Sequence, residues 1–162
     1  MDRSLRSRSL RATCALLGLL ALGACRREEE EPPPPTNIAP ELGVDVSEME
    51  RTASGLYIKV LEEGTGDPPR PGLRMGFQYK TWLVDGTVVD STVPGLPQRA
   101  TLGEDFMIDG FMEGIEGIRM GEERLLLIKP ELGYGVDVAP GIPRNAWLVI
   151  RLQRVPPERT AG

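Results

Sequence analysis

Proline and glycine are the residues that most constrain the fold of this chain. Fifteen prolines and nineteen glycines occur among its 162 residues. Proline interrupts helices because it lacks the N–H and clashes with the preceding turn, whereas glycine favours turns and loops. This density excludes a bundle of long helices and indicates short strands joined by many turns. Because 40% of the residues are apolar, the chain can still bury a hydrophobic core. We therefore expect a mostly β domain.

Short segments of strand-forming residues alternate with these turns. Residues 73–81 alternate apolar with polar or small side chains, which is the period of a strand. Asp85-Gly86 suits a tight hairpin turn, because glycine tolerates a positive φ. The predicted strands cover residues 56–61, 73–81, 88–89, 101–102, 124–129 and 146–154. Their order predicts an antiparallel sheet.

One helix is predicted, beginning at Asp109, which could cap it. Phe111, Ile115 and Ile118 follow at i, i+4 and i+7, so they would share one face. One short helix packed across an antiparallel sheet places the chain in the α+β class. The predicted domain covers residues 52–157, which is long enough to fold alone.

The first 24 residues are predicted to be an export signal. Residues 1–11 contain four arginines, and Ala12 to Ala24 form an apolar run shorter than the ~20 residues that a helix needs to cross a bilayer. Leu22-Gly23-Ala24-Cys25 resembles the cleavage site of bacterial lipoproteins. We expect residues 1–24 to be removed and Cys25 to be acylated. An ordinary secretory signal with an incidental cysteine is the alternative.

Residues 25–51 are predicted to form a tether. Glu28 to Glu31 are followed by Pro32 to Pro35, and such a sequence favours an extended, solvated chain. Residues 158–162 would be a short tail. The expected location is the cell envelope, on the periplasmic or extracytoplasmic side and anchored to a membrane by lipid. The outer membrane is favoured, since Arg26 and not aspartate follows Cys25.

Composition excludes several kinds of chemistry. The chain has no histidine, which excludes Ser-His and Cys-His catalytic pairs and zinc sites built on imidazole. Its net charge of −5 argues against a protein that follows nucleic-acid phosphates. Cys14 would leave with the signal and Cys25 would be acylated, so no free thiol would remain. We expect no metal and no cofactor.

Several sequence motifs follow one another in a fixed order. They are Tyr79 with LVDGTVVDS at residues 83–91, MIDGFMEGI at 107–115, IKPELGYG at 128–135 and GIPRNA at 141–146. Together they resemble the FKBP-type peptidyl-prolyl cis-trans isomerases over roughly residues 55–155. The resemblance implies an FKBP-like antiparallel half-barrel sheet wrapped around one short helix, with an apolar cleft between them. It also implies rotation of Xaa–Pro bonds in proline-containing, unfolded or folding envelope proteins.

The resemblance implies a role in the cleft for particular residues. Asp90 and Tyr134 would be catalytic, with Asp90 at the pocket edge and the Tyr134 hydroxyl directed at the substrate backbone. The Ile108 N–H would bind a substrate carbonyl. Phe111 would form the floor, where the best-known members have tryptophan. The implied substrate-binding residues are Tyr79, Val89, Met107, Ile108, Phe111, Ile142 and Ile150.

The sequence departs from the family at four further matching positions besides Phe111. Val89 and Ile150 stand where well-studied members have phenylalanine, Gln98 replaces a third, and Ala139 stands where some members have histidine. We therefore expect a wider, less aromatic pocket, slower catalysis and weak binding of macrolides such as tacrolimus and rapamycin. The same departures keep an alternative open: a weakly catalytic chaperone or peptide-binding module on the membrane surface.

Overall fold

The computed structural model describes residues 33–104, 107–137 and 139–157. The predicted signal segment, Cys25 and the C-terminal tail lie outside these ranges. The strands are β1 (Glu50–Arg51), β2 (Tyr57–Glu62), β3 (Arg74–Leu83), β4 (Val88–Ser91), β5 (Gln98–Thr101), β6 (Glu123–Ile128) and β7 (Leu148–Val155). One α-helix, α1 (Asp109–Gly114), and three 3₁₀-helices, η1 (Pro40–Leu42), η2 (Val46–Glu48) and η3 (Pro130–Leu132), complete the described elements.

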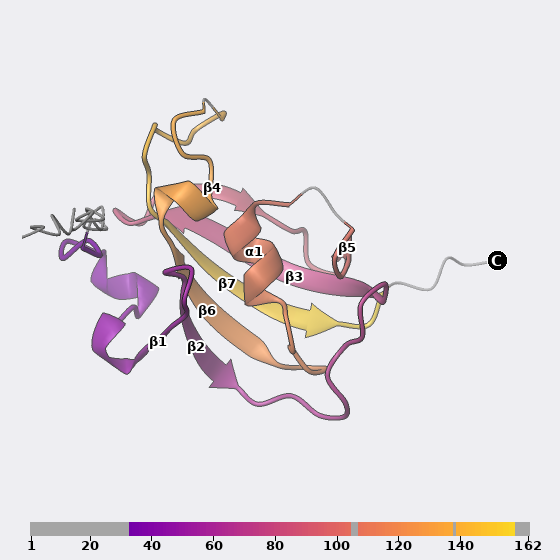
Figure 1. The fold of residues 1–162 in the computed structure, drawn as a ribbon. Helices are drawn as coiled ribbons and strands as arrows, with labels where there is room; N and C mark the ends of the chain where they lie inside the picture. The colour runs from indigo at the N-terminus through magenta and orange to yellow at the C-terminus, as the bar shows by residue number, and fades with distance from the viewer. Residues whose placement is uncertain (1–32, 105–106, 138, 158–162) are drawn as a thin grey trace, which may run out of the picture. The chain divides into compact units, whose positions relative to one another are not determined.

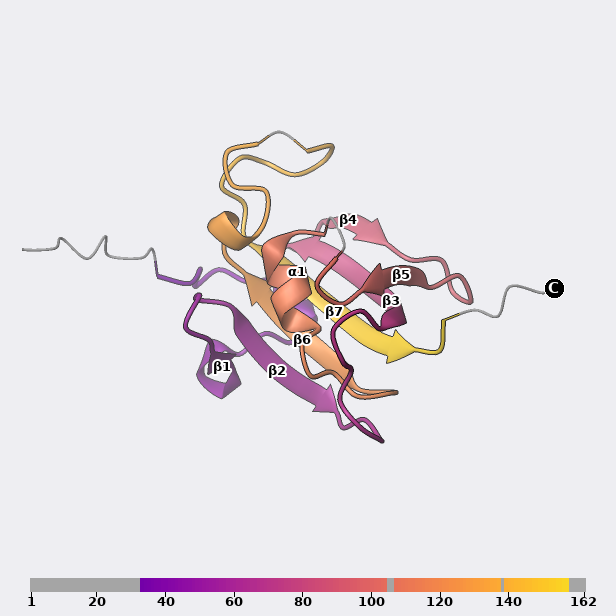
Figure 2. The same ribbon diagram turned by 45° about the vertical axis from the view of Figure 1, so that its right-hand side comes forward.

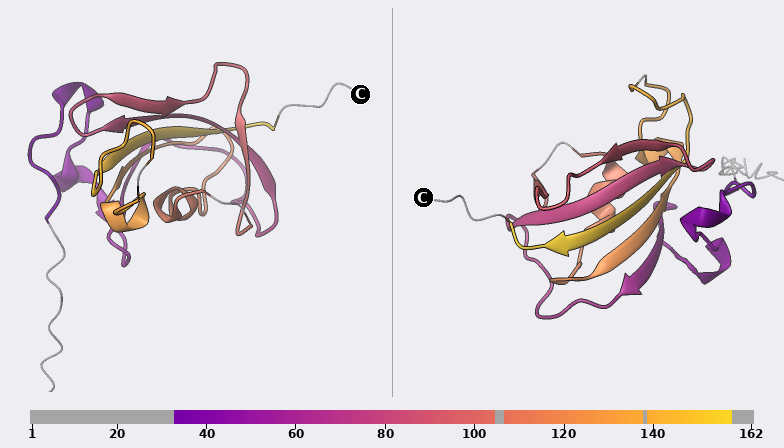
Figure 3. Two further views of the ribbon diagram at one scale, coloured as in Figure 1. Left: turned by 90° about the horizontal axis from the view of Figure 1, so that it is seen from above. Right: turned by 180° about the vertical axis from the view of Figure 1, so that it is seen from behind.

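The strands form one antiparallel sheet in the order β1-β2-β6-β7-β3-β4. β5 also pairs with β3, so β4 and β5 lie one after the other along the same edge. The sheet curves around α1, which crosses its concave face (Figure 1), and the view from above shows the sheet arching over the helix (Figure 3). The predicted α+β arrangement is confirmed, and each predicted strand is present with its ends shifted by a few residues.

The helix is shorter than the sequence predicts. It ends at Gly114, so Ile115 and Ile118 lie beyond it, although both are fully buried. The chain turns away at Gly117, where φ is +68°, a conformation that favours glycine. Asp109 is the first helical residue and not the cap, because the capping position belongs to Ile108. At that place its carboxylate still faces the positive end of the helix dipole.

The main core fills the space between α1 and the concave face. Inward side chains of β3, β6 and β7 meet the helix there, and Phe77 and Phe111 are the largest of its buried side chains. Gly110 lets the helix approach closely: a Cβ atom at this position would lie 2.6 Å from the side chain of Ile128. The sheet and helix are therefore in direct contact, and the cleft described below opens beside that contact.

A second core lies on the convex face of the sheet. Because successive side chains of a strand point to opposite faces, Leu125 and Leu127 of β6 face this core, while their neighbours face α1. Partly buried side chains of the preceding segment pack against it: Ile38, Leu42, Val44 and Val46. The backbone contributes as well, since the Ala39 N–H donates to the Val84 carbonyl (2.7 Å).

Residues 38–49 therefore do not form the extended tether that the sequence predicts. The glutamate and proline runs end at Pro35. The apolar residues that follow are irregularly spaced, but they cover the apolar side chains on the convex face of the sheet. Residues 33–162 form one compact unit with both cores inside it. None of the helices within the described residues is long and apolar enough to cross a membrane.

Candidate active site

A cleft opens between α1, the concave face of the sheet and the loop that precedes β7. It encloses about 130 Å³, which is room for one side chain and much less than a drug-sized pocket. Its lining residues are Tyr79, Thr81, Val89, Asp90, Met107, Ile108, Phe111, Tyr134, Ile142, Leu148 and Ile150. The structure thus brings together all nine of the site residues expected from the sequence. Their roles in binding and catalysis stay predictions.

Phe111 forms the floor of the cleft. It is 1% exposed, and its ring meets those of Phe77 and Tyr79 edge to face, with centroids 5.8 and 5.7 Å apart. Such contacts fix the ring in one orientation. The floor is therefore an apolar ring packed between two other rings.

Two arginines of the sheet hold the chain at the C-terminal end of α1. The Nη1 atom of Arg124 in β6 donates to the carbonyls of Gly114 (2.8 Å) and Glu116 (2.7 Å). Arg154 in β7 donates to the carbonyl of Ile118 (2.9 Å). A helix of six residues cannot satisfy its last carbonyls or remain stable alone. These bonds therefore fix the helix, and the floor that it carries, against the sheet.

The N-terminal end of α1 presents a backbone donor to the cleft. The Ile108 carbonyl accepts bonds from the N–H groups of Phe111 (2.9 Å) and Met112 (3.1 Å). Within the described part of the chain, the Ile108 N–H itself donates to no carbonyl. The resemblance assigns this N–H to a substrate carbonyl, and that role stays a prediction.

Asp90 is held at the cleft edge by two hydrogen bonds. Its Oδ2 accepts from the Tyr79 hydroxyl (2.6 Å) and its Oδ1 from the Ser91 N–H (2.8 Å). Burial, followed by the bond to Asp90, raises the pKa of Tyr79 well above its ordinary value of 10.0. Tyr79 therefore stays protonated and remains a donor to Asp90 throughout the physiological pH range.

A bulge in β4 explains how two consecutive residues line one cleft. Asp90 pairs with Thr81 and Val88 with Trp82, so Val89 has no partner of its own on β3. In a regular strand Val89 and Asp90 would face opposite sides of the sheet, and a bulge of this kind redirects a side chain. The sequence contains no signal for this bulge apart from the motif itself.

Tyr134 stands at the rim, in the loop after η3. Tyr134 is 38% exposed, and the glycines on either side allow a tight turn, with Gly135 at φ +56°. Gly135 anchors the loop: its N–H donates to the Pro130 carbonyl (2.8 Å) and its carbonyl accepts from the Asn145 N–H (2.7 Å). Figure 2 shows this long loop standing beyond the end of α1. The Tyr134 hydroxyl can thus reach a peptide at the mouth of the cleft.

Two residues that line the cleft were not predicted from the sequence. Two of the positions that depart from the family pattern do not line the cleft. Thr81 and Leu148 line the cleft because they alternate with Tyr79 and Ile150 along inward faces of β3 and β7, and that period alone could have found them. Gln98 is exposed in β5 and Ala139 lies in the loop; neither lines the cleft.

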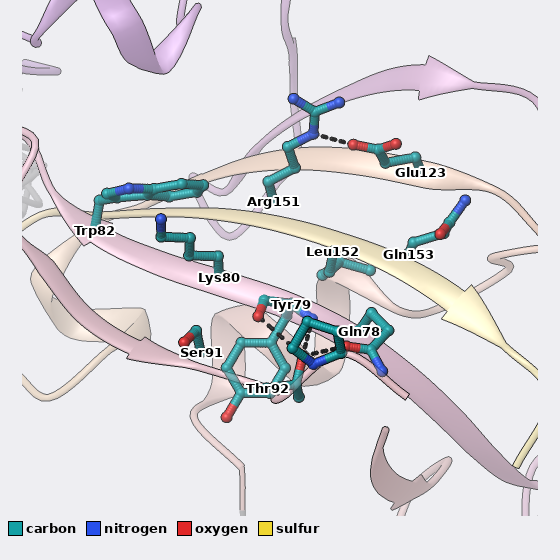
Figure 4. Close-up of a pocket in the computed structure, with 11 residues that line it drawn as sticks. Gln78, Tyr79, Lys80, Trp82, Ser91, Thr92, Glu123, Arg151, Leu152 and Gln153 are labelled. Atoms are coloured by element: carbon teal, nitrogen blue, oxygen red, sulfur yellow. Dashed lines mark hydrogen bonds and ion pairs between the residues drawn. The ribbon is translucent and has the colours of Figure 1, made fainter. Parts of the chain in front are cut away.

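A larger hollow, the back-face hollow, lies on the convex face. It encloses about 480 Å³. Figure 4 shows Trp82, Lys80 and Arg151 on the face of the sheet away from the Tyr79 ring. The ammonium of Lys80 lies 5.2 Å from the centroid of the Trp82 ring and Arg151 pairs with Glu123, so these polar groups engage one another. Seven of its eleven lining residues are charged or polar, whereas seven of the eleven that line the cleft are apolar, and we therefore place the candidate site in the smaller cleft.

The cleft contains nothing that indicates a metal. No cluster of three or more His, Cys, Asp or Glu side chains with metal-binding geometry occurs among residues 33–104, 107–137 and 139–157. Its polar groups are one carboxylate, three hydroxyls and a backbone N–H. This set can bind a peptide backbone.

Known proteins resemble the chain in sequence and fold. Residues 66–153 match the family described as FKBP-type peptidyl-prolyl cis-trans isomerase. "FK506-binding protein 4" of Mycosarcoma maydis is 39% identical over 102 residues, which are 63% of this chain and 27% of that protein. "FKBP-type peptidyl-prolyl cis-trans isomerase FkpA" of Escherichia coli (strain K12) is 30% identical over 154 residues, which are 94% of this chain and 54% of that protein.

Solved structures agree with these relatives. The crystal structure of FkpA from Escherichia coli matches with a TM-score of 0.62 at 32% identity, over 73% of this chain and 56% of that one. A peptidyl-prolyl cis-trans isomerase from Pseudomonas syringae matches with a TM-score of 0.59 at 26% identity, over 67% of this chain and 79% of that one. The chain spans about half or less of the length of these curated relatives.

Proposed function

Because this chain belongs to the FKBP-type peptidyl-prolyl cis-trans isomerases, we propose that its cleft catalyses rotation about Xaa–Pro bonds in polypeptides. The observation that carries the proposal is the small apolar cleft floored by Phe111, with an Ile108 N–H at its edge that donates to no carbonyl of the described residues. Such a cleft has room for one proline ring and a donor for the peptide backbone beside it.

The reaction needs no nucleophile, which agrees with the absence of histidine. Amide resonance gives the rotation a barrier of ~18–20 kcal/mol, and no covalent bond forms or breaks. The cleft accelerates the rotation if it binds the twisted amide more tightly than the planar one. Each ~1.4 kcal/mol of that preference gives a factor of ten in rate. An apolar floor favours the twisted amide, because twisting removes the charge separation that water stabilises.

Individual residues have distinct roles in this proposal. Phe111 supports the proline ring, and the Ile108 N–H donates to a substrate carbonyl. Tyr134 donates its hydroxyl to the substrate backbone from the rim. Asp90, held by Tyr79, places a fixed negative charge at the edge where the amide carbon becomes more positive on twisting.

Variants of Asp90 and Tyr134 test the proposal. We expect residues 33–162 to accelerate cis–trans exchange in an Ala-Leu-Pro-Phe peptide, measured by NMR exchange spectroscopy. Asp90→Ala and Tyr134→Phe should each lower the acceleration about tenfold, the effect of one hydrogen bond or charge of ~1.4 kcal/mol. Asp85→Ala in the same hairpin and Tyr57→Phe in the second core are the matched controls and should keep full activity. A folded wild-type chain that gives no acceleration would refute the proposal.

A peptide-binding module is the second candidate. Val89 and Ile150 leave the cleft walls less aromatic than in well-studied members, and exposed apolar side chains, Val88 (49%) and Val136 (63%), flank residues of the cleft. The less aromatic walls and the exposed Val136 in the loop that carries Tyr134 favour holding an unfolded chain, whereas Val88 pairs with Trp82 on the other face. Peptide binding without acceleration would support this candidate. Weak binding of macrolides stays a prediction, and it rests on the less aromatic cleft walls at Val89 and Ile150.

We also propose that the protein works in the cell envelope, anchored by lipid on Cys25. The basic N-terminal segment, the short apolar run and the cysteine after Ala24 support this placement. Folding and unfolded exported polypeptides would then be its substrates, since slow Xaa–Pro isomerisation limits their folding. In a bacterial host we expect labelled palmitate to be incorporated into the wild-type chain and not into Cys25→Ser. Incorporation into both would contradict the anchor.

A further inference from the structure

Thr81 places a buried hydroxyl at the wall of the cleft. The residue lies in the middle of β3, is 5% exposed and lines the cleft. The sequence reasoning did not include it, because a threonine in a strand is unremarkable by composition. Its surroundings in the structure are what make it unusual.

The Thr81 hydroxyl has no hydrogen-bond partner in the described part of the chain. Asp90 in β4 and Ile150 in β7 are its partners in register, so the three side chains lie in a row on the same face. The oxygens of Asp90 accept from the Tyr79 hydroxyl and from the Ser91 N–H, and neither bond involves Thr81. Ile150 offers no polar atom. Among the residues that the structure describes, no group hydrogen-bonds the Thr81 hydroxyl.

The small part of the Thr81 hydroxyl that remains exposed faces the cleft. Within the described residues, Arg154 Nε is the one side-chain polar atom that is both completely buried and unpaired. The Thr81 oxygen therefore keeps some contact with open space, and the space that Thr81 borders is the cleft. A bound peptide would fill that space and remove the remaining water.

The Thr81 hydroxyl makes no hydrogen bond that supports the fold among the described residues. Valine has nearly the same shape as threonine and carries no polar group, so it would fill the site at little or no cost in stability. A polar group that stability does not explain is expected at a functional site.

We propose that Thr81 is a further catalytic residue, whose hydroxyl donates a hydrogen bond to the nitrogen of the Xaa–Pro amide as the bond twists. This inference rests on the proposed isomerase function. In the planar amide the nitrogen lone pair is delocalised into the carbonyl, so the nitrogen is a poor acceptor. In the twisted amide the lone pair is localised on nitrogen and can accept the bond. The proton stays on the threonine oxygen, and no covalent bond changes.

The timing of this bond determines its kinetic effect. An interaction that exists only in the transition state raises kcat and leaves KM unchanged. Loss of the hydroxyl should therefore lower kcat and should not weaken binding of the planar substrate. A purely structural residue would instead change activity in proportion to stability.

Two substitutions at position 81 test the inference. We expect Thr81→Val in residues 33–162 to lower kcat for the Ala-Leu-Pro-Phe peptide about tenfold, with KM within a factor of two and a Tm equal to or higher than that of the wild type. Thr81→Ser keeps the hydroxyl and loses a methyl group, so it should have a lower Tm and keep most of the activity. The measurements are NMR line-shape analysis over peptide concentration and thermal unfolding.

The controls separate this inference from the proposed function. Thr101→Val, in β5 and outside the cleft lining, should leave kcat unchanged. A wild-type chain without acceleration refutes the isomerase function itself. An active wild type with Thr81→Val at full kcat, or with activity that follows Tm across both variants, overturns the catalytic role of Thr81 alone.

Discussion

A chain that begins at residue 52 should be much less stable than one that begins at residue 33. The shorter chain loses β1 and the apolar side chains of residues 38–49 that cover the convex face. Leu125, Leu127 and Val149, which are at most 2% exposed, would then meet water. We expect the loss to equal at least one large-to-small core substitution, about 2–5 kcal/mol, together with aggregation through the new apolar patch. Urea unfolding of both chains measures it.

Point substitutions in the same segment provide the control for this truncation. Met49 is 9% exposed and belongs to the second core, so Met49→Ala should lower the free energy of unfolding by about 2–5 kcal/mol. Its neighbour Glu48 pairs with Lys59 at the surface, and Glu48→Ala should change stability by less than about 1 kcal/mol. Equal stability of the two truncated chains, or a neutral Met49→Ala, would show that the segment does not support the sheet.

Shortening Phe111 should cost both stability and activity. Phe111→Ala removes the ring of a residue that is 1% exposed and that contacts Phe77 and Tyr79. We expect the free energy of unfolding to fall by about 3–5 kcal/mol. The milder Phe111→Leu keeps enough core to fold, but it gives the proline ring a non-planar and more mobile support. Because small misplacements at a reacting group cost up to ~100-fold in rate, we expect at least a tenfold loss of exchange acceleration in Phe111→Leu.

Phe77 is the matched control for the floor. It is 0% exposed in the same core and packs edge to face against Phe111, yet it does not line the cleft. Phe77→Leu should therefore lose a similar amount of stability in urea unfolding and keep exchange acceleration within about threefold of the wild type. If both variants lost activity equally, the effect would come from the core and not from the floor of the cleft.

The sheet could be predicted from the sequence, whereas its second core could not. Alternation along residues 73–81 and the Asp85-Gly86 turn determine β3 and its return strand through local chemistry. The covering of Leu125 and Leu127 depends instead on residues some 80 positions earlier, whose irregular apolar spacing has no strand or helix period. Such long-range packing has no local signal in the sequence. The preceding glutamate and proline runs predicted an extended tether, which is wrong for residues 38–49.

The ordered motifs predicted which residues line the cleft, whereas the local backbone geometry that places them is visible only in the structure. The nine residues expected from the resemblance converge in one lining, although they come from five separate stretches of chain. The end of α1 at Gly114 and the bulge at Val89 could not be foreseen. Both depend on contacts between elements: the close approach of α1 to β6 and the register of β4 on β3.

The cleft and the back-face hollow compete directly as the place where a prolyl peptide binds. An amide-shift titration of ¹⁵N-labelled residues 33–162 with Ala-Leu-Pro-Phe distinguishes them, because Ile108 and Phe111 report on the cleft, whereas Lys80 and Arg151 report on the hollow. Our account predicts large shifts at Ile108 and Phe111, saturating together, with Arg151 unchanged. Shifts confined to Lys80 and Arg151, with the Ile108 amide unmoved, would contradict it.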